Sequence, residues 1–207
     1  MNRVDELISR YPVLEVCRES IEESCDMICE CVKSGGKILT CGNGGSAADS
    51  QHIVGELMKS FVKNRPVDEK ILSRIDDENL RGYFRKNLQS GIPAMSLVSE
   101  SALITAYLND CEPNLVFAQQ VLGIGNAGDV LLGISTSGNS SNAVYAFEIA
   151  RAKNLKTIAL TGKSGGKLKS IADISICVPS EVTFQIQELH LPIYHALCLE
   201  IEARFFA

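Results

Sequence analysis

The chain has 207 residues, of which 45% are hydrophobic and 22% charged, as is usual for a globular protein with one sizeable core. Its net charge of −5 argues against a nucleic-acid-binding surface, because such surfaces carry a basic patch. The N-terminus lacks an apolar signal segment, and no stretch approaches the roughly 18 apolar residues of a membrane span. We therefore expect a cytoplasmic protein that binds neither nucleic acid nor membrane.

The N-terminal segment, residues 1–35, is predicted to form a long helix. Its apolar residues recur every three or four positions, at Leu14, Cys17, Ile21, Cys25, Ile28 and Val32. The spacing of Cys25, Cys29 and Cys31 is not one that zinc sites use, so we interpret them as small buried hydrophobic residues. A lone helix ahead of a complete domain commonly buries such a stripe against another subunit, which predicts a symmetric homo-oligomer.

Five short apolar runs follow, and each is predicted to be a buried strand: 37–42, 94–98, 129–135, 156–162 and 174–180. Helical patterns such as 142–154 lie between them, and a long helix from Thr183 to Phe206 closes the chain. Buried strands that alternate with helices are typical of a parallel sheet covered on both faces. We predict an α/β fold, a doubly wound parallel five-stranded sheet sandwiched by helices, as a single domain over residues 1–207.

The segment 63–91 interrupts this alternation. It is rich in charge and has apolar residues at helical spacing. We interpret it as a helical insertion of one or two amphipathic surface helices between a helix and a strand. Nothing in it indicates catalysis.

Two predicted strands end in loops suited to an anion. CGNGGS, at 41–46, supplies glycines that let the backbone approach a ligand, and its serine can cap the next helix. ISTSGNSSN, at 134–142, places four hydroxyls ahead of a helix N-terminus, those of Ser135, Thr136, Ser137 and Ser140. Ligands of an open α/β sheet bind beyond the carboxyl ends of its strands, so these loops predict a phosphate site. No GxxxxGK[ST] motif is present, so we do not expect a nucleotide P-loop.

Four further polar residues lie on the predicted helices. His52 and Glu56 are four residues apart and therefore share a helix face. Gln187 and His195 lie two turns apart, about 80° around an ideal helix. Zinc tolerates such a donor set, but the set is not diagnostic of zinc, so spacing alone leaves the metal open.

Five motifs together resemble the sugar isomerase (SIS) domain, and specifically the phosphoheptose isomerase family: GNGGSAADSQH, NDCEPNLVFAQQ, GDVLLGISTSGNSSN, TGKSGGKLKSIAD and QIQELHLPIYH. The resemblance covers roughly residues 37–207. It implies a flavodoxin-like sheet and conversion of sedoheptulose 7-phosphate to D-glycero-D-manno-heptose 7-phosphate through an enediol. It also implies a homotetramer with one zinc ion in each subunit.

The resemblance implies a role for each matching residue. The phosphate would be bound by Ser135, Thr136, Ser137 and Ser140. The sugar would be contacted by Asn43, Gly44, Gly45, Ser46, Glu56, Asn109, Asp110 and Gln187. Zinc would be bound by His52, Glu56, Gln187 and His195. Glu56 and His195 would also be the proton-transfer pair.

Three other functions are open to such a chain. An isomerase of another phosphosugar is the main alternative. Some SIS-domain proteins are non-catalytic and bind a replication-initiation partner, but the presence of both Glu56 and His195 argues against that function. A sugar-phosphate-sensing transcription regulator would need a helix-turn-helix domain, for which residues 1–35 leave little room.

Overall fold

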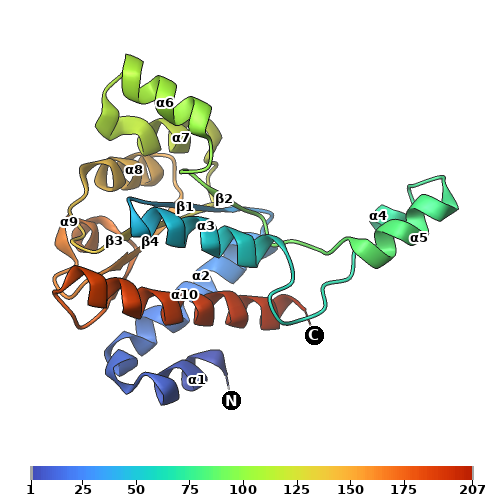
Figure 1. Ribbon diagram of the computed structural model, residues 1–207, viewed down its shortest axis with the longest axis horizontal. Coiled ribbons are helices and arrows are strands. Elements are labelled where there is room, and N and C mark those ends of the chain that lie inside the picture. The colour runs from blue at the N-terminus through green and yellow to red at the C-terminus, as the bar shows by residue number, and fades with distance from the viewer. Residues whose placement is uncertain (1, 207) are drawn as a thin grey trace.

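In the computed structural model, which describes residues 2–206, five strands form one parallel sheet (Figure 1). The strands are β1 (Ile38–Gly42), β2 (Ala94–Ser96), β3 (Val130–Ser135), β4 (Lys156–Thr161) and β5 (Ile174–Cys177). Their order is β2-β1-β3-β4-β5, and each neighbouring pair is parallel. This order is that of flavodoxin, so the predicted doubly wound sheet is confirmed.

Helices cover both faces of the sheet, which is why its central strands are mostly apolar and almost completely buried (Figure 1). One face packs against α2 (Arg18–Lys33), α3 (Gly45–Met58) and α10 (Thr183–Phe205). The other face packs against α7 (Val116–Ile124), α8 (Ser141–Ala152) and α9 (Gly166–Ile171). Residues alternate between the two layers, so that Ile38 of β1 joins the first core and Leu39 the second.

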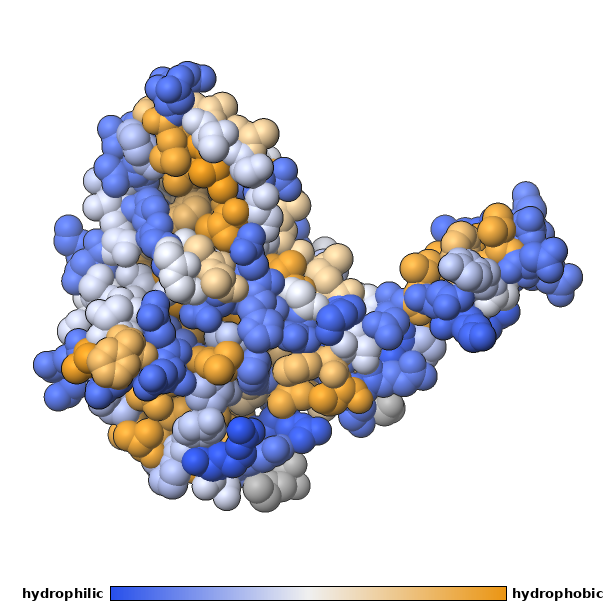
Figure 2. All heavy atoms as spheres, in the orientation of Figure 1, coloured by the Kyte–Doolittle hydropathy of each residue, from blue (hydrophilic) through white to orange (hydrophobic). Residues whose placement is uncertain are grey.

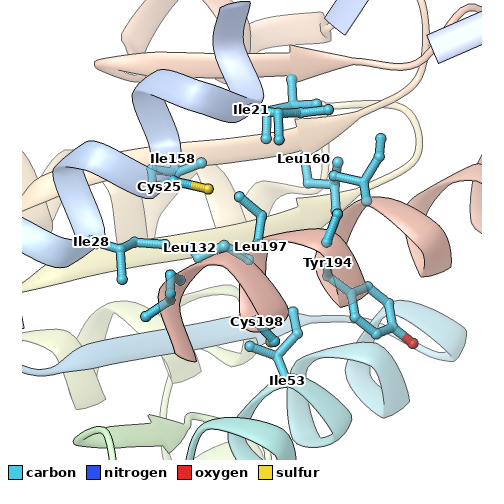
Figure 3. Close-up of a cluster of buried hydrophobic side chains, with 14 of the residues drawn as sticks. Ile21, Cys25, Ile28, Ile53, Leu132, Ile158, Leu160, Tyr194, Leu197 and Cys198 are labelled. Atoms are coloured by element: carbon cyan, nitrogen blue, oxygen red, sulfur yellow. The ribbon is translucent and has the colours of Figure 1, made fainter. Parts of the chain in front are cut away.

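The apolar stripe of the N-terminal segment lies in the protein's own core, where Figure 3 shows Ile21, Cys25 and Ile28 among side chains of the sheet and α10. Leu14 and Ile21 are completely buried. The prediction that this stripe is buried against another subunit was therefore wrong. Cys25, Cys29 and Cys31 are buried thiols, as the sequence predicted.

The predicted long N-terminal helix is confirmed over residues 12–33, where the 3₁₀ helix η1 (Pro12–Cys17) leads directly into α2. A separate short helix, α1 (Arg3–Arg10), precedes it. The break falls at Tyr11 and Pro12, because a proline disfavours helical backbone in the residue before it. The separate α1 packs across α10.

Residues 66–90, which we call the arm, project from the body and contain α4 (Glu69–Leu72) and α5 (Glu78–Asn87) (Figure 1). The structure thus has two helices where the sequence predicted one or two. Asp68 and Asp77 cap these helices by accepting hydrogen bonds from backbone N–H groups of the first turns. No residue of α5 is buried, and Figure 2 shows hydrophobic side chains on the surface of the arm, where Ile71 and Leu80 are exposed.

The connection from β2 to β3 contains α6 (Ser101–Asp110), the 3₁₀ helix η2 (Pro113–Leu115) and α7. At the other end of the chain, α10 continues through Pro192 as one helix of 23 residues. No helix described in residues 2–206 is both long and apolar enough to cross a membrane.

Candidate active site

A pocket of about 240 Å³ lies at the carboxyl ends of β1 and β3, where the sequence predicts the phosphate site. The loops after these strands and the first turns of α10 supply its lining residues: Asn43, Gly44, Gly45, Ser46, Ile134, Ser135, Thr136, Ser140, Thr183 and Gln187. None of these ten residues is charged. An anion in this pocket would therefore be bound by hydroxyls and by the N-termini of α3 and α8.

The backbone of the two loops is shaped by glycine. Gly44 precedes α3 with φ 56°, a left-handed conformation that a side chain would disfavour. Gly138 also has a positive φ of 65°, and a side chain there would collide with the carbonyl of Gly165. The loop after β3 thus packs closely against the start of α9, which fixes its hydroxyls beside the pocket.

The four hydroxyls of the second loop do not have the same role. Ser135 Oγ and Ser140 Oγ lie 3.0 Å apart at the pocket. Ser137 is exposed, lies outside the pocket lining, and its Oγ accepts a hydrogen bond of 3.1 Å from the backbone N–H of Asn139. Its hydroxyl therefore stabilises the turn.

We expect Ser135→Ala and Ser140→Ala each to weaken binding of inorganic phosphate by about 1–2 kcal/mol, the contribution of a hydrogen bond to a charged group. Ser137→Ala is the matched control in the same loop, with a smaller effect because its side chain faces the turn. Isothermal titration calorimetry with phosphate would measure all three. Equal affinities for the parent protein and the first two variants would contradict a phosphate site here.

Gln187 and Thr183 reach the pocket from α10. A Cβ placed on Gly45 would come within 2.5 Å of Gln187 Nε2, so the amide lies directly against the first loop. Thr183 was not predicted from the sequence, although it stands one helical turn before Gln187 and so shares its face. The structure thus places Gln187 with the phosphate loops.

A second group of polar side chains, which we call the polar cluster, lies between α3 and α10. His52 Nδ1 is 3.0 Å from the Tyr194 hydroxyl, and His52 Nε2 is 3.2 Å from Glu56 Oε1. Tyr194 donates a hydrogen bond of 3.2 Å to Asp49 Oδ1, and Figure 3 shows its hydroxyl directed away from the hydrophobic core. Lys59 Nζ donates to Glu56 Oε2 at 3.1 Å. The predicted pair His52 and Glu56 is therefore in direct contact.

His195 lies beside this cluster in a largely aromatic environment. The centroid of its ring is 5.1 Å from that of His52, 5.0 Å from that of Tyr194 and 5.6 Å from that of Phe61. Burial, together with His52, lowers the pKa of His195 below its ordinary value of 6.5, although Glu56 opposes the shift. Its buried Nε2 has no hydrogen-bond partner among the described residues. The lowered pKa favours the neutral imidazole, and the buried Nε2 is a nitrogen without a hydrogen-bond partner.

The phosphate pocket and the polar cluster lie along the same pair of helices. α3 and α10 pack against each other, and each contributes residues to both. Gln187 at the pocket and His195 at the cluster are eight residues apart, about 12 Å along a helix. Such a separation suits a phosphosugar whose reacting carbons lie several bonds from its phosphate.

The four predicted zinc ligands do not form a metal site as they stand. Across residues 2–206, no three His, Cys, Asp or Glu side chains are grouped so that they could hold a metal ion. His52 and Glu56 contact each other, and Gln187 lies against the phosphate loops.

Two predicted sugar contacts lie away from the phosphate pocket. Asn109 and Asp110 are exposed at the end of α6, where the Asn109 amide donates to the Asp110 carboxylate at 2.8 Å. Asn43, by contrast, lines the pocket and exchanges two hydrogen bonds of 2.9 Å with Asn142 of α8. This amide pair joins the two phosphate loops.

The fold and the phosphate pocket define a phosphosugar-binding α/β protein, and the SIS domain family matches residues 2–84 and 81–162. The phosphoheptose isomerase of Shewanella sp. (strain ANA-3) is 38% identical over 201 residues, which cover 96% of this chain and 90% of that protein. The phosphoheptose isomerase of Akkermansia muciniphila is 36% identical, covering 99% and 96%. A phosphoheptose isomerase structure from Francisella tularensis superposes with a TM-score of 0.77 at 32% identity, covering 98% and 100%. The chain belongs to the phosphoheptose isomerase family.

Proposed function

We propose that this protein converts sedoheptulose 7-phosphate to D-glycero-D-manno-heptose 7-phosphate. The observation that carries the proposal is the alignment of an uncharged phosphate pocket with a carboxylate and a neutral imidazole along α3 and α10. The relatives named above, phosphoheptose isomerases at 36% and 38% identity, support the seven-carbon substrate.

The reaction moves two protons. One passes from C1 to C2 of the sugar, and the other passes from the oxygen on C1 to the oxygen on C2, with an enediol between the two steps. Glu56 is the base that removes the proton from C1 and returns it to C2. Lys59 pairs with the far oxygen of that carboxylate and orients it. His195, neutral and with a free nitrogen, moves the proton between the oxygens.

An assay of the purified protein against a panel of phosphorylated ketoses of five, six and seven carbons tests this function. We expect the highest kcat/KM for sedoheptulose 7-phosphate, because the distance between the phosphate pocket and the polar cluster favours a sugar with many carbons. Preference for a shorter sugar would identify an isomerase of another phosphosugar. Lack of turnover with every sugar would support a non-catalytic protein.

Zinc is a further part of the proposal and comes from the family resemblance. His52 and Glu56 would have to exchange their mutual contact for the ion, whereas His195 Nε2 is already free. We expect one zinc per subunit by mass spectrometry of metals, and a lower content in His52→Gln. Protein that stays metal-free after incubation with zinc would contradict this part.

We also propose a homotetramer, again from the family resemblance. Light scattering at micromolar concentration should give four times the mass of one chain. The apolar stripe of the N-terminal segment is buried in the core of its own subunit, so the subunits must contact each other through other surfaces. A monomer under these conditions would contradict the proposal.

A further inference from the structure

Arg65 and Glu202 form an ion pair that is completely buried, with 2.7 Å between Arg65 Nε and Glu202 Oε1. We call this pair, with the backbone groups it contacts, the clamp. It lies where the end of α10 meets the loop that leaves α3 (Figure 1). Neither residue belongs to the polar cluster or to the phosphate pocket.

Arg65 caps the end of α3. Its Nη1 donates to the carbonyl of Leu57 at 2.6 Å, and its Nη2 donates to the carbonyl of Glu56 at 3.0 Å. The last four carbonyls of a helix have no partners within it, and a cation at that end also complements the helix dipole. The capped turn is the one that carries the proposed catalytic carboxylate. Arg65 therefore restrains the backbone of Glu56 itself.

Glu202 fixes the segment that follows α3. Its two carboxylate oxygens accept hydrogen bonds from the backbone N–H groups of Phe61, Val62 and Lys63, at 2.8, 2.9 and 3.0 Å. The ring of Phe61 packs at 5.6 Å from the ring of His195. The same carboxylate thus holds the backbone of a residue that covers the proposed proton shuttle.

We propose that Arg65 and Glu202 are positioning residues for the isomerisation, which set the backbone of Glu56 and the placement of Phe61 over His195. This inference rests on the proposed function. A buried ion pair adds little net stability compared with well-packed apolar side chains, so stability alone is a weak reason for one at this place. Its contacts instead span both members of the proposed proton-transfer pair.

Arg65→Lys tests the proposal because it keeps the positive charge, but its single ammonium nitrogen cannot occupy the three separate positions from which the guanidinium nitrogens contact Glu202 and the two carbonyls. We expect kcat to fall about 10- to 100-fold, since a displacement of about 1 Å in a catalytic group can have such an effect. KM and the affinity for inorganic phosphate should change little, because the phosphate pocket lies at the other end of α3. Glu202→Asp, whose shorter carboxylate cannot reach all three N–H groups, should act in the same way.

Asp129→Asn is the matched control. Asp129 is buried and pairs with Lys37 at the amino end of the sheet, away from the polar cluster. Its substitution should lower the melting temperature while kcat per folded molecule is unchanged. If the clamp had a purely structural role, Arg65→Lys would also lower the melting temperature without changing kcat per folded molecule.

Unchanged kcat in folded Arg65→Lys and Glu202→Asp, with Glu56→Gln inactive, would overturn the positioning role and leave the proposed function intact. An active Glu56→Gln would instead refute the proposed function. Failure of both clamp variants to fold, while Asp129→Asn folds, would also overturn the proposal, because the clamp would then be required for the fold itself.

Discussion

Glu56→Gln is expected to lower kcat by about 10² to 10⁴, the usual contribution of a positioned general base. The amide keeps the size and polarity of the side chain but cannot accept the carbon-bound proton. Folding and phosphate affinity should persist, because the phosphate pocket does not include Glu56. Steady-state kinetics with sedoheptulose 7-phosphate measures the change.

Two controls accompany this variant. Glu78→Gln alters an exposed acid in the arm and should leave kcat unchanged. If Glu56 and His195 act as a unit, the double variant Glu56→Gln/His195→Gln should lose little more activity than either single variant. Metal content has to be measured in each protein, since loss of a ligand would resemble loss of a base. Near-normal turnover of folded Glu56→Gln would refute the assignment.

Glu202→Gln is expected to destabilise the protein by about 3–5 kcal/mol, because it leaves the Arg65 charge buried without a counterion. Glu69→Gln is the matched control. Glu69 also pairs with an arginine, accepting two hydrogen bonds from Arg85, but it lies in the exposed arm, where such pairs contribute about 0–1 kcal/mol. Urea unfolding at pH 7 compares the two. Equal effects would show that burial does not govern the strength of these pairs.

The effect of Glu202→Gln should depend on pH. Burial alone would raise the pKa of Glu202, but three backbone N–H groups and Arg65 outweigh it and lower this pKa below its ordinary value of 4.5. The stabilisation by the carboxylate is thus fully present above 4.5 and is lost as the pH falls through the pKa of the folded state. The difference in unfolding free energy between the parent and Glu202→Gln should therefore shrink below pH 4.5. A constant difference across this range would contradict the lowered pKa.

The sheet could be predicted because its strands are buried on both faces and appear as apolar runs between turn residues. Their predicted bounds differ from the observed ones by three residues or fewer. The long N-terminal helix could be predicted from the periodicity of 14–32, but this pattern begins after Tyr11 and Pro12 and so did not indicate the separate helix α1. The surface against which its apolar stripe packs could not be predicted, because periodicity identifies an apolar helix face but not the element that covers it.

The phosphate loops could be predicted for a local reason, since each is a short stretch at a strand end. The role of Ser137 in binding phosphate stays a prediction, because its hydroxyl accepts a hydrogen bond from the backbone of its own turn in this structure. Asp49 and Tyr194 were missed because their contact joins residues 145 positions apart. Asp49 does share a helix face with His52 and Glu56, at intervals of three and four, and that spacing was an available signal.

The ends of the arm are adjacent in space. Ser90 donates through its N–H to the carbonyl of Arg65 at 2.9 Å and through its hydroxyl to that of Pro66 at 2.7 Å. Residues 67–89 therefore begin and end at almost one point, and their helices pack mainly on each other. Chain inserted at such a point does not disturb the core. The arm is in this sense modular: a short linker could replace it, and a foreign peptide or fluorescent protein could be carried in its place.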